Sequence, residues 1–254
     1  MTAGPGSRPG SPVAAAMVLA AGLGTRMRPI TDHTPKCLVR VAGRTLLDRA
    51  LDRVAEAGVG HAVVNLHHHA DQVRAHLAAR TAPPPLRLSD ESGLLLETGG
   101  GLKKALPLLG DGPFLACNSD VICLNGPDAP AFRRLADAWD DAAMDALLLL
   151  VPTPQAHGYD GPGDFALDPD GRLRRRGEAA AAPFVYSGAM VCHPRLFAGA
   201  PDGAFSMNLL FDRALAAGRL HGLVHDGAWY HVGTPASIAA TERLMGADSP
   251  APAR

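Results

Sequence analysis

The sequence lacks the features that would assign it to a disulfide-rich, membrane or nucleic-acid-binding class. Its four cysteines, Cys37, Cys117, Cys123 and Cys192, form no C-x-x-C pair and are too sparse for a disulfide framework. Charged residues make up 19% of the chain and the net charge is -1, which gives no electrostatic basis for binding nucleic acid or an anionic membrane. No run reaches the roughly 18 apolar residues of a membrane-spanning helix. We therefore expect reduced, packed cysteines and a small-molecule partner.

The two ends of the chain differ in composition from the rest. Residues 1–12 are rich in Gly, Pro and Ser, which predicts a tail, and residues 247–254 are interpreted in the same way. These two tails flank a single predicted domain over 13–246. The apolar run from Val13 to Leu23 follows Arg8 and could be the core of a secretory signal. Its removal would discard a strand and cut into a glycine-rich loop. We therefore expect a cytoplasmic protein, as a monomer or small homo-oligomer.

The apolar pattern of the first half alternates short β-like runs with helical ones. Strands are predicted at 13–20, 61–66, 86–90, 113–120 and 145–153, and helices at 45–58, 69–80, 100–109 and 129–142. Thr45 suits the start of one helix and Gly58 its left-handed end. Strands that are apolar on both faces and separated by helices indicate an α/β, Rossmann-like fold, with a mixed, mostly parallel sheet and helices on both faces.

The pattern changes after Pro154. Residues 163–176 predict a β-hairpin that turns at Asp170-Gly171, and a strand-like run at 184–193 and two helical stretches follow. We therefore divide the domain into two halves, 13–152 and 153–246, that pack as one body.

The loop after the first predicted strand, residues 19–36, has the strongest chemical signal. In doubly wound folds the ligand binds at the carboxyl ends of the strands, where this loop begins. Gly22 and Gly24 allow backbone N–H groups to approach phosphate oxygens, and Arg26 and Lys36 supply positive charge. The loop therefore suits a triphosphate and a departing pyrophosphate.

Three other interpretations of this loop are a dinucleotide fingerprint, a Walker loop and a plain glycine turn with two surface cations. The first needs a glycine where Met27 stands, and the second needs G-K-[ST], which is absent. The full string from Gly22 to Lys36, G-x-G-T-R-M-R-P-x-T-x-x-x-P-K, resembles the signature of the sugar-1-phosphate nucleotidyltransferases. Later segments at 95–120, 163–165, 186–188 and 229–235 extend the resemblance over roughly Val13 to Met245.

The resemblance implies the nucleotide-diphospho-sugar transferase fold and a reaction in which a sugar 1-phosphate attacks a nucleoside triphosphate and releases pyrophosphate. The half 13–152 would bind the nucleotide and the half 153–246 the sugar. Likeness within the family favours UTP and N-acetylmuramate 1-phosphate, and GTP with mannose 1-phosphate is the alternative. Two further hypotheses are a non-catalytic nucleotide- or sugar-binding protein and a cytidylyltransferase that acts on a non-sugar phosphate.

The resemblance also implies roles for individual residues. Arg26 would stabilise the departing pyrophosphate, and Lys36 would bridge the α-phosphate and the sugar phosphate. A glycine-rich turn at Gly99 and Gly100 would lie beside the base. The full nucleotide-binding set would be Leu19, Ala20, Ala21, Gly22, Gly24, Thr25, Arg26, Asn65, Glu97, Gly99, Gly100 and Asn118.

The sugar would contact residues of the second half. The residues implied for this role are Asp164, Glu178, Ser187 and Gly188. Asp164 and Glu178 are equally well explained as solvated carboxylates of the hairpin.

A metal ion is implied at Asp120. This residue follows the apolar run 113–117, which places its carboxylate at the ligand-binding edge of the sheet. A carboxylate is a hard oxygen donor and suits Mg²⁺ there. The alternative interpretation is that Asp120 caps a helix or forms a turn. The family commonly has a second carboxylate in the pattern W-x-D-x-G-T, but this chain has His231 there. The imidazole of His231 could bind a metal directly, in which case it suits Mn²⁺ better than Mg²⁺. It could instead hydrogen-bond a metal-bound water. A packing histidine in a strand between Tyr230 and Val232 is the other interpretation.

Other polar clusters give weaker signals. The run His67–His69 is not expected to bind metal, because consecutive side chains point in different directions; we expect it in a loop, with Asn65 near the nucleotide. The run Arg174–Arg176 is interpreted as a solvated face beside the hairpin. Cys37 is the thiol at risk of reaction, because the charge of Lys36 beside it would lower its pKa.

Overall fold

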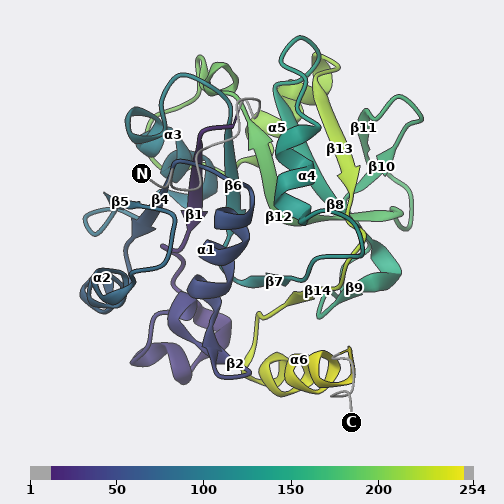
Figure 1. The fold of residues 1–254 in the computed structure, drawn as a ribbon. Coiled ribbons are helices and arrows are strands. Elements are labelled where there is room, and N and C mark those ends of the chain that lie inside the picture. The colour runs from purple at the N-terminus through teal and green to yellow at the C-terminus, as the bar shows by residue number, and fades with distance from the viewer. Residues whose placement is uncertain (1–12, 249–254) are drawn as a thin grey trace, which may run out of the picture.

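A mixed sheet forms the centre of the protein (Figure 1). The structure is a computed structural model that describes residues 13–248. Within this range, seven strands lie side by side in the order β5 (Leu86–Asp90), β4 (His61–Leu66), β1 (Ala15–Leu19), β6 (Phe114–Asn118), β12 (Phe184–Cys192), β8 (Ala146–Pro152) and β13 (Leu220–Val224). All run in one direction except β12, which is antiparallel to both of its neighbours. The expected mixed, mostly parallel sheet is confirmed, and the expected tail at 1–12 lies outside the described residues.

The predicted hairpin extends this sheet. Strands β10 (Phe165–Leu167) and β11 (Leu173–Arg175) pair antiparallel, and β10 joins the beginning of β12 through Phe165 and Phe184. At its tip, the Asp170 carboxylate accepts the Arg172 N–H, and Gly171 has a φ of 83°, which favours glycine. The hairpin prediction is confirmed.

Helices cover both faces of the sheet (Figure 1). One face is covered by α1 (Leu46–Glu56), α2 (Ala70–Ala79) and α4 (Ala131–Asp137), and the other by α3 (Glu97–Leu109) and α5 (Asn208–Ala216). Alternate residues of each strand enter opposite cores; for example, Val18 packs with α1 and Met17 with α3. Thr45 caps α1 by accepting the N–H of Asp48, as predicted. No helix in residues 13–248 is long and apolar enough to cross a bilayer.

A small second sheet and the last helix lie beside the end of the main sheet (Figure 1). This sheet comprises β7 (Val121–Cys123), β14 (Trp229–His231) and β9 (Ala156–His157). A separate short hairpin is formed by β2 (Arg40–Val41) and β3 (Arg44–Thr45). It contacts the last helix, α6 (Pro235–Asp248). A third apolar cluster, which includes Met27, Ile122 and Tyr230, joins these parts. α6 continues to Asp248, past the expected start of the tail at 247.

Helix α4 is shorter than the predicted 129–142. It begins after Pro130 and ends at Asp137, and the chain then turns at Asp140, whose carboxylate accepts the N–H of Ala142. An Asp side chain that bonds to the backbone two residues on competes with helical hydrogen bonds, which explains the early end.

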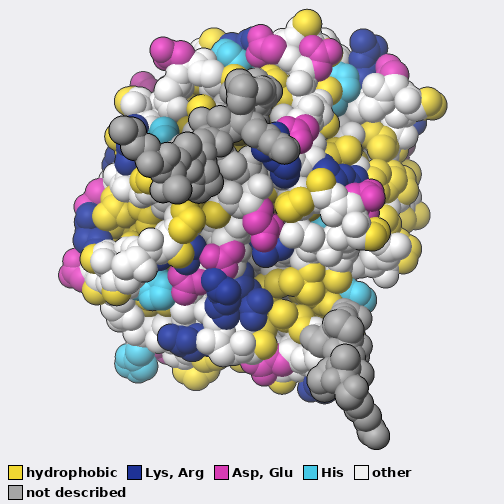
Figure 2. All heavy atoms as spheres, in the orientation of Figure 1, with side chains coloured by type: hydrophobic (Ala, Val, Ile, Leu, Met, Phe, Trp, Pro, Cys, Tyr) yellow, Lys and Arg dark blue, Asp and Glu magenta, His cyan; other side chains and the backbone are white. Residues whose placement is uncertain are grey.

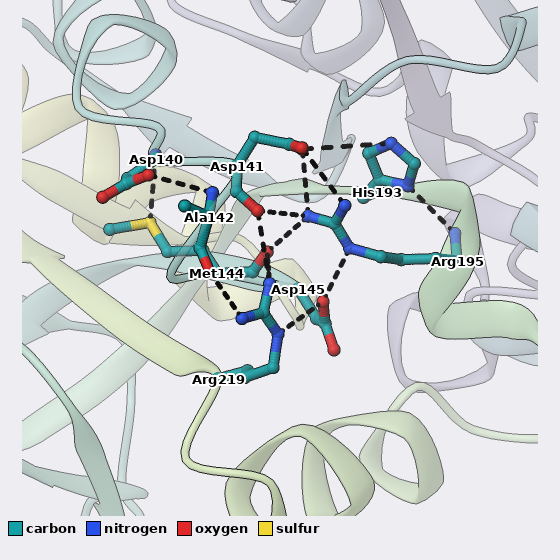
Figure 3. A network of polar contacts seen from close by, with 8 residues as sticks. All are labelled: Asp140, Asp141, Ala142, Met144, Asp145, His193, Arg195 and Arg219. Atoms are coloured by element: carbon teal, nitrogen blue, oxygen red, sulfur yellow. Dashed lines mark hydrogen bonds and ion pairs between the residues drawn. The ribbon is translucent and has the colours of Figure 1, made fainter.

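The turn after α4 is held by a polar network that joins three strands (Figure 3). Oδ1 of Asp145, just before β8, accepts hydrogen bonds from Nε of Arg195 at 2.8 Å and Nε of Arg219 at 2.9 Å. Arg195 follows β12 and also pairs with Asp141, while Arg219 precedes β13 and also donates to the Met144 carbonyl. One carboxylate therefore fixes the adjoining ends of β8, β12 and β13.

We expect Asp145→Asn to lower the free energy of unfolding by about 1–3 kcal/mol, because two partly buried guanidinium groups lose a shared charged acceptor. Chemical denaturation of the parent and variant measures this difference. The control is Asp202→Asn, because the Asp202 carboxylate pairs with Lys103 at 2.6 Å but is itself fully exposed. Equal denaturation midpoints for the parent and Asp145→Asn would show that the network does not stabilise the fold.

Candidate active site

A cavity of about 320 Å³ opens at the carboxyl ends of β1, β4, β5 and β6, where the sequence predicted a ligand. Ten of the predicted nucleotide-binding residues line it: Leu19, Ala20, Ala21, Gly22, Gly24, Thr25, Arg26, Asn65, Glu97 and Asn118. Lys36 and Asp120 also line it. The structure therefore brings together residues that are up to about a hundred positions apart in the sequence.

The glycine-rich loop is shaped by Gly24. Its φ of 62° favours glycine, and a Cβ there would lie 2.9 Å from both the Lys36 Cβ and the Thr31 Cγ2. The Thr31 hydroxyl donates to the Gly24 carbonyl at 2.8 Å, which holds the loop against the segment that carries Lys36. At Gly22, by contrast, a Cβ would meet nothing within 4 Å, so the backbone there faces open space. Substituting Gly24 would displace Lys36, whereas the open backbone at Gly22 leaves room for a phosphate group.

Asn65 holds the beginning of the same loop. Its side-chain oxygen accepts the Ala20 N–H at 2.6 Å, and its nitrogen donates to Oε1 of Glu91 at 2.8 Å. Both polar atoms of this buried amide are therefore engaged by the protein, and Asn65 positions the loop while it lines the cavity.

Glu91 is a cavity residue that sequence reasoning missed. It follows β5 and is only 1% exposed, and its Oε2 is buried without a hydrogen-bond partner in the described part of the chain. Burial raises the pKa of this carboxyl group, and the Asn65 amide only partly offsets the shift. A buried acceptor with a free lone pair is costly unless a ligand satisfies it. The signal in the sequence was its place directly after a predicted strand, the same signal that identified Asp120.

The expected glycine-rich turn at Gly99 and Gly100 is wrong, because both residues lie inside α3 and neither lines the cavity. Their N–H groups donate to the Phe205 carbonyl at 2.8 and 3.1 Å. A Cβ would lie 2.4 Å from the Phe205 ring at Gly99 and 2.2 Å from the Gly203 carbonyl at Gly100. The glycines therefore allow residues 203–205 to pack against α3. Glu97, with a φ of 56°, and Thr98 are the residues of this helix that line the cavity.

Three ionisable side chains meet at the carboxyl end of β6. Nζ of Lys36 lies 2.7 Å from Oδ2 of Asp120, and Nε2 of His231 lies 3.7 Å from the same oxygen. His231 reaches this position because β14 pairs with β7, which places it opposite Val121. Burial would raise the pKa of Asp120, but the His231 imidazole and the Lys36 ammonium together hold it well below its usual range. The carboxylate is therefore kept ionised.

Arg26 lies on the same side of the cavity. A Cβ on Gly233, which also lines the cavity, would lie 3.3 Å from Nη1 of Arg26 and 2.8 Å from Cε1 of His231. Among residues 13–248, Arg26 has no carboxylate within ion-pair distance. Its charge is thus available to an anionic ligand.

The residues expected to contact the sugar do not line this cavity. The Asp164 carboxylate accepts the Tyr186 N–H at 2.9 Å, and Glu178 is exposed in the turn after β11. Ser187 is buried, and its carbonyl accepts the Trp229 indole N–H at 2.9 Å. Gly188, with a φ of 88°, lies beside Asn118, which does line the cavity; a Cβ there would lie 3.0 Å from Nδ2 of Asn118. These residues lie in the hairpin or in the irregular part of β12.

A second cavity of about 190 Å³ adjoins the first and was not predicted. The two share Leu19, Thr98 and Asn118, and the smaller one is otherwise lined by Tyr186, Met190, Ser206, Met207, Asn208 and Phe211. Most of these residues come from β12 and from the segment that begins α5. The second half of the chain therefore lines most of a smaller cavity next to the main one.

The side chains of the weaker clusters are engaged by the protein. His67 and His68 each hydrogen-bond a backbone carbonyl, and the expectation that they bind no metal stays a prediction. Arg174 and Arg175 pair with the surface residues Asp168 and Asp212. Charges of both signs are mixed over the face in Figure 2.

We expect iodoacetamide to leave activity nearly unchanged, because all four cysteines are buried and burial raises each thiol pKa. For Cys37 the pKa rises to about 12, so the expected activation by Lys36 is wrong: desolvation dominates. The measurement is turnover and peptide mass after treatment of the folded protein. Rapid loss of activity with the label on Cys37 would contradict this expectation.

Comparison with known proteins gives one consistent result. The sequence profile of the MobA-like NTP transferase domain matches residues 16–198. The chain is 48% identical over 233 residues to N-acetylmuramate alpha-1-phosphate uridylyltransferase of Caulobacter vibrioides, covering 90% of this chain and 96% of the relative. Its identity to the protein of that name from Neisseria meningitidis serogroup B is 36% over 234 residues, covering 91% and 98%. UDP-glucose pyrophosphorylase complexed with UDP-glucose shares the fold, with a TM-score of 0.77 at 13% identity over 93% of this chain and 100% of that one.

Proposed function

Because the chain belongs to the MobA-like NTP transferase family and is a sugar-1-phosphate nucleotidyltransferase, we propose that it joins UTP to N-acetylmuramate 1-phosphate and releases pyrophosphate. The observation that carries the proposal is the cavity, in which the glycine-rich loop, Arg26, Lys36 and Asp120 converge. The 48% identity to the Caulobacter relative supports the choice of substrates.

The reaction needs positioned charge more than covalent chemistry. A sugar-phosphate oxygen attacks the α-phosphorus in line, and the bond to the pyrophosphate oxygen breaks. Backbone N–H groups of the loop would hold the triphosphate, with Arg26 at the departing pyrophosphate. Lys36, already fixed at the carboxyl end of β6, would bridge the α-phosphate and the incoming sugar phosphate.

The donor atoms beside Lys36 fit a divalent metal ion. Asp120 provides a carboxylate that its neighbours keep ionised, and the Nε2 atom of His231 faces it. We propose that these two residues hold Mg²⁺ or Mn²⁺ together with the nucleotide. The bound ion would neutralise charge on the triphosphate.

The buried carboxyl of Glu91 suits the base. Its unpaired Oε2 can accept the N3–H of uracil, while the Asn65 amide holds the other oxygen. The ribose and phosphates would then run along the loop toward Lys36. The second cavity, which shares Asn118 with the first, is the position that we propose for the sugar. Gly188 lies against Asn118, and the Asp164 carboxylate accepts the Tyr186 N–H of β12. Glu178 would have to move inward to contact the sugar, because it is exposed.

The test is pyrophosphate release for every pairing of four nucleoside triphosphates with a panel of phosphates that includes N-acetylmuramate 1-phosphate, mannose 1-phosphate and choline phosphate. We expect the highest kcat/KM for UTP with N-acetylmuramate 1-phosphate. In Glu91→Ala, we expect the KM for UTP to rise by about tenfold, because one base contact is worth roughly 1–2 kcal/mol. Preference for another pairing would replace the proposed substrates, and no turnover of any pairing would favour a non-catalytic binding protein.

A further inference from the structure

We propose that Asn208 determines sugar specificity: in the second cavity its side-chain amide donates to the carboxylate that N-acetylmuramate carries on its lactyl ether and that neutral sugars lack. The inference rests on the proposed function for the presence of the sugar in this cavity. It goes further, because it names the group that separates an acidic from a neutral sugar phosphate. The neutral sugar for comparison is N-acetylglucosamine 1-phosphate, which differs from the proposed substrate only in lacking the lactyl group.

The segment that leads to Asn208 is held tightly against α3. Two N–H groups of α3 donate to the Phe205 carbonyl at 2.8 and 3.1 Å, and the Met207 N–H donates to the Thr98 hydroxyl at 3.0 Å. Helix α5 then begins at Asn208, whose side chain lines the second cavity together with Thr98. A ligand therefore meets a wall whose position is fixed before it binds.

Arg175 decides which end of the Asn208 amide is available. Nη2 of Arg175 lies 3.0 Å from Oδ1 of Asn208, and a guanidinium group can only donate, so this atom is the amide oxygen. The NH₂ group of Asn208 has no acceptor among residues 13–248 and is left to a ligand. Arg175 is itself held by Asp212 at 2.8 Å and lies 4.8 Å from the centre of the Phe165 ring. Asn208 thus offers donors to the cavity.

Other polar side chains of the cavity also have hydrogens to donate. Oγ of Ser206 already accepts the Asn208 N–H at 3.2 Å, and the Thr98 hydroxyl oxygen accepts the Met207 N–H, so both hydroxyl hydrogens can turn to a ligand. Burial raises the pKa of the Tyr186 phenol well above its usual value, so this group remains a donor. In the described part of the chain, no Asp or Glu side chain lines the second cavity.

A donor-rich cavity without a carboxylate fits an acidic ligand better than a set of sugar hydroxyls. A hydroxyl needs an acceptor for its own hydrogen, whereas a carboxylate has only lone pairs and takes several donors. Hydrogen bonds to a charged group are also the stronger ones. Met190 and Phe211 supply apolar surface for the methyl group of the lactyl ether. Because Asp212 neutralises Arg175, the selection depends on the orientation of the Asn208 amide rather than on a free positive charge.

The test compares kcat/KM at saturating UTP for N-acetylmuramate 1-phosphate, its lactyl amide and N-acetylglucosamine 1-phosphate. The amide keeps the shape of the acid but removes its charge. We expect the parent to favour the acid over the amide by about tenfold or more. Asn208→Asp keeps an acceptor for Arg175 but replaces the two donors by a negative oxygen. This variant should lower the preference about a hundredfold, with kcat/KM for N-acetylglucosamine 1-phosphate within about threefold of the parent.

Leu209→Asp is the matched control, because it adds the same charge at the next position of α5, where the side chain is exposed and lines neither cavity. It should keep the preference of the parent. Arg175→Met tests the positioning of the amide: it should raise the KM for the acid severalfold and leave kcat for N-acetylglucosamine 1-phosphate unchanged, which a general loss of structure would not do. Thermal unfolding verifies each fold. Should Asn208→Asp not fold, Asn208→Ala replaces it, with a tenfold loss of preference expected.

Three results would overturn the inference: a parent that treats acid and amide alike, an unchanged preference in Asn208→Asp, or an equal loss for all three substrates in that variant. Calorimetric titration of the sugars, in the presence of a UTP analogue that cannot be cleaved, separates this inference from the proposed function. Binding of the acid that depends on Asn208 but leads to no turnover would contradict the proposed function alone. Turnover of UTP without discrimination between acid and amide would contradict this inference alone.

Discussion

Lys36→Ala and Arg26→Ala each lower kcat by about two to four orders of magnitude while the protein stays folded, if the charges act where the structure places them. Lys36 is held in the cavity by its 2.7 Å contact with Asp120, and Arg26 has its charge available to the ligand. Both charges matter most when negative charge shifts toward the pyrophosphate. The measurement is steady-state pyrophosphate release, with thermal unfolding to verify the fold.

A matched control separates the loss of charge from the loss of an ion pair. Lys103 is also partly buried and pairs with an aspartate, Asp202, but it lies on α3 outside the cavity. Lys103→Ala should therefore keep kcat close to that of the parent. If Lys36→Ala and Arg26→Ala remain within about threefold of the parent, the roles assigned here are wrong.

Asp120→Asn should nearly abolish activity. The substitution keeps the shape of the side chain but removes the charge that attracts Lys36 and, in our proposal, the metal. Lys36 and His231 hold the pKa of this carboxyl below its usual range, so the parent acts as a carboxylate throughout the neutral pH range. An amide is a weaker ligand, and it leaves the Lys36 ammonium without its partner.

Activity of this variant is measured against Mg²⁺ and Mn²⁺ concentration and after addition of a chelator. Asp226→Asn is the control, because Asp226 is similarly exposed and pairs with Arg134 outside the cavity. The control should unfold at a lower temperature but keep its turnover per folded molecule. A chelator without effect, or an Asp120→Asn variant as active as the parent, would exclude the proposed metal mechanism.

The main strands and the glycine-rich loop were predictable because their signals are local. The apolar run of β1, the helical spacing of α1 and the loop ending in Lys36 each occupy one continuous segment. The contact between Asp120 and His231 was not predictable in this way. It depends on β7, a strand of three residues directly after Asp120, and on its pairing with β14 more than a hundred residues later.

The errors in the candidate site have the same origin. Gly99 and Gly100 have the composition of a turn, and only contact with residues 203–205 explains why a helix needs glycine there. Glu91 has an ordinary sequence context, and its burial and unpaired oxygen arise from β4 and α3 packing around it. Similarly, Cys37 has a cationic neighbour in sequence but is desolvated in the fold.

The place of β12 in the sheet has a consequence for synthesis of the protein. β8 pairs only with β12 and β13 among the described strands, and both emerge from the ribosome after it. A nascent chain that ends at Pro152 can assemble β5, β4, β1 and β6, but its apolar segment Ala146–Pro152 has no strand to pair with. Such a segment is prone to association with other chains until translation is almost complete. Truncation at this point should therefore yield aggregates, and chimaeras with relatives should exchange the chain through β13 as one piece.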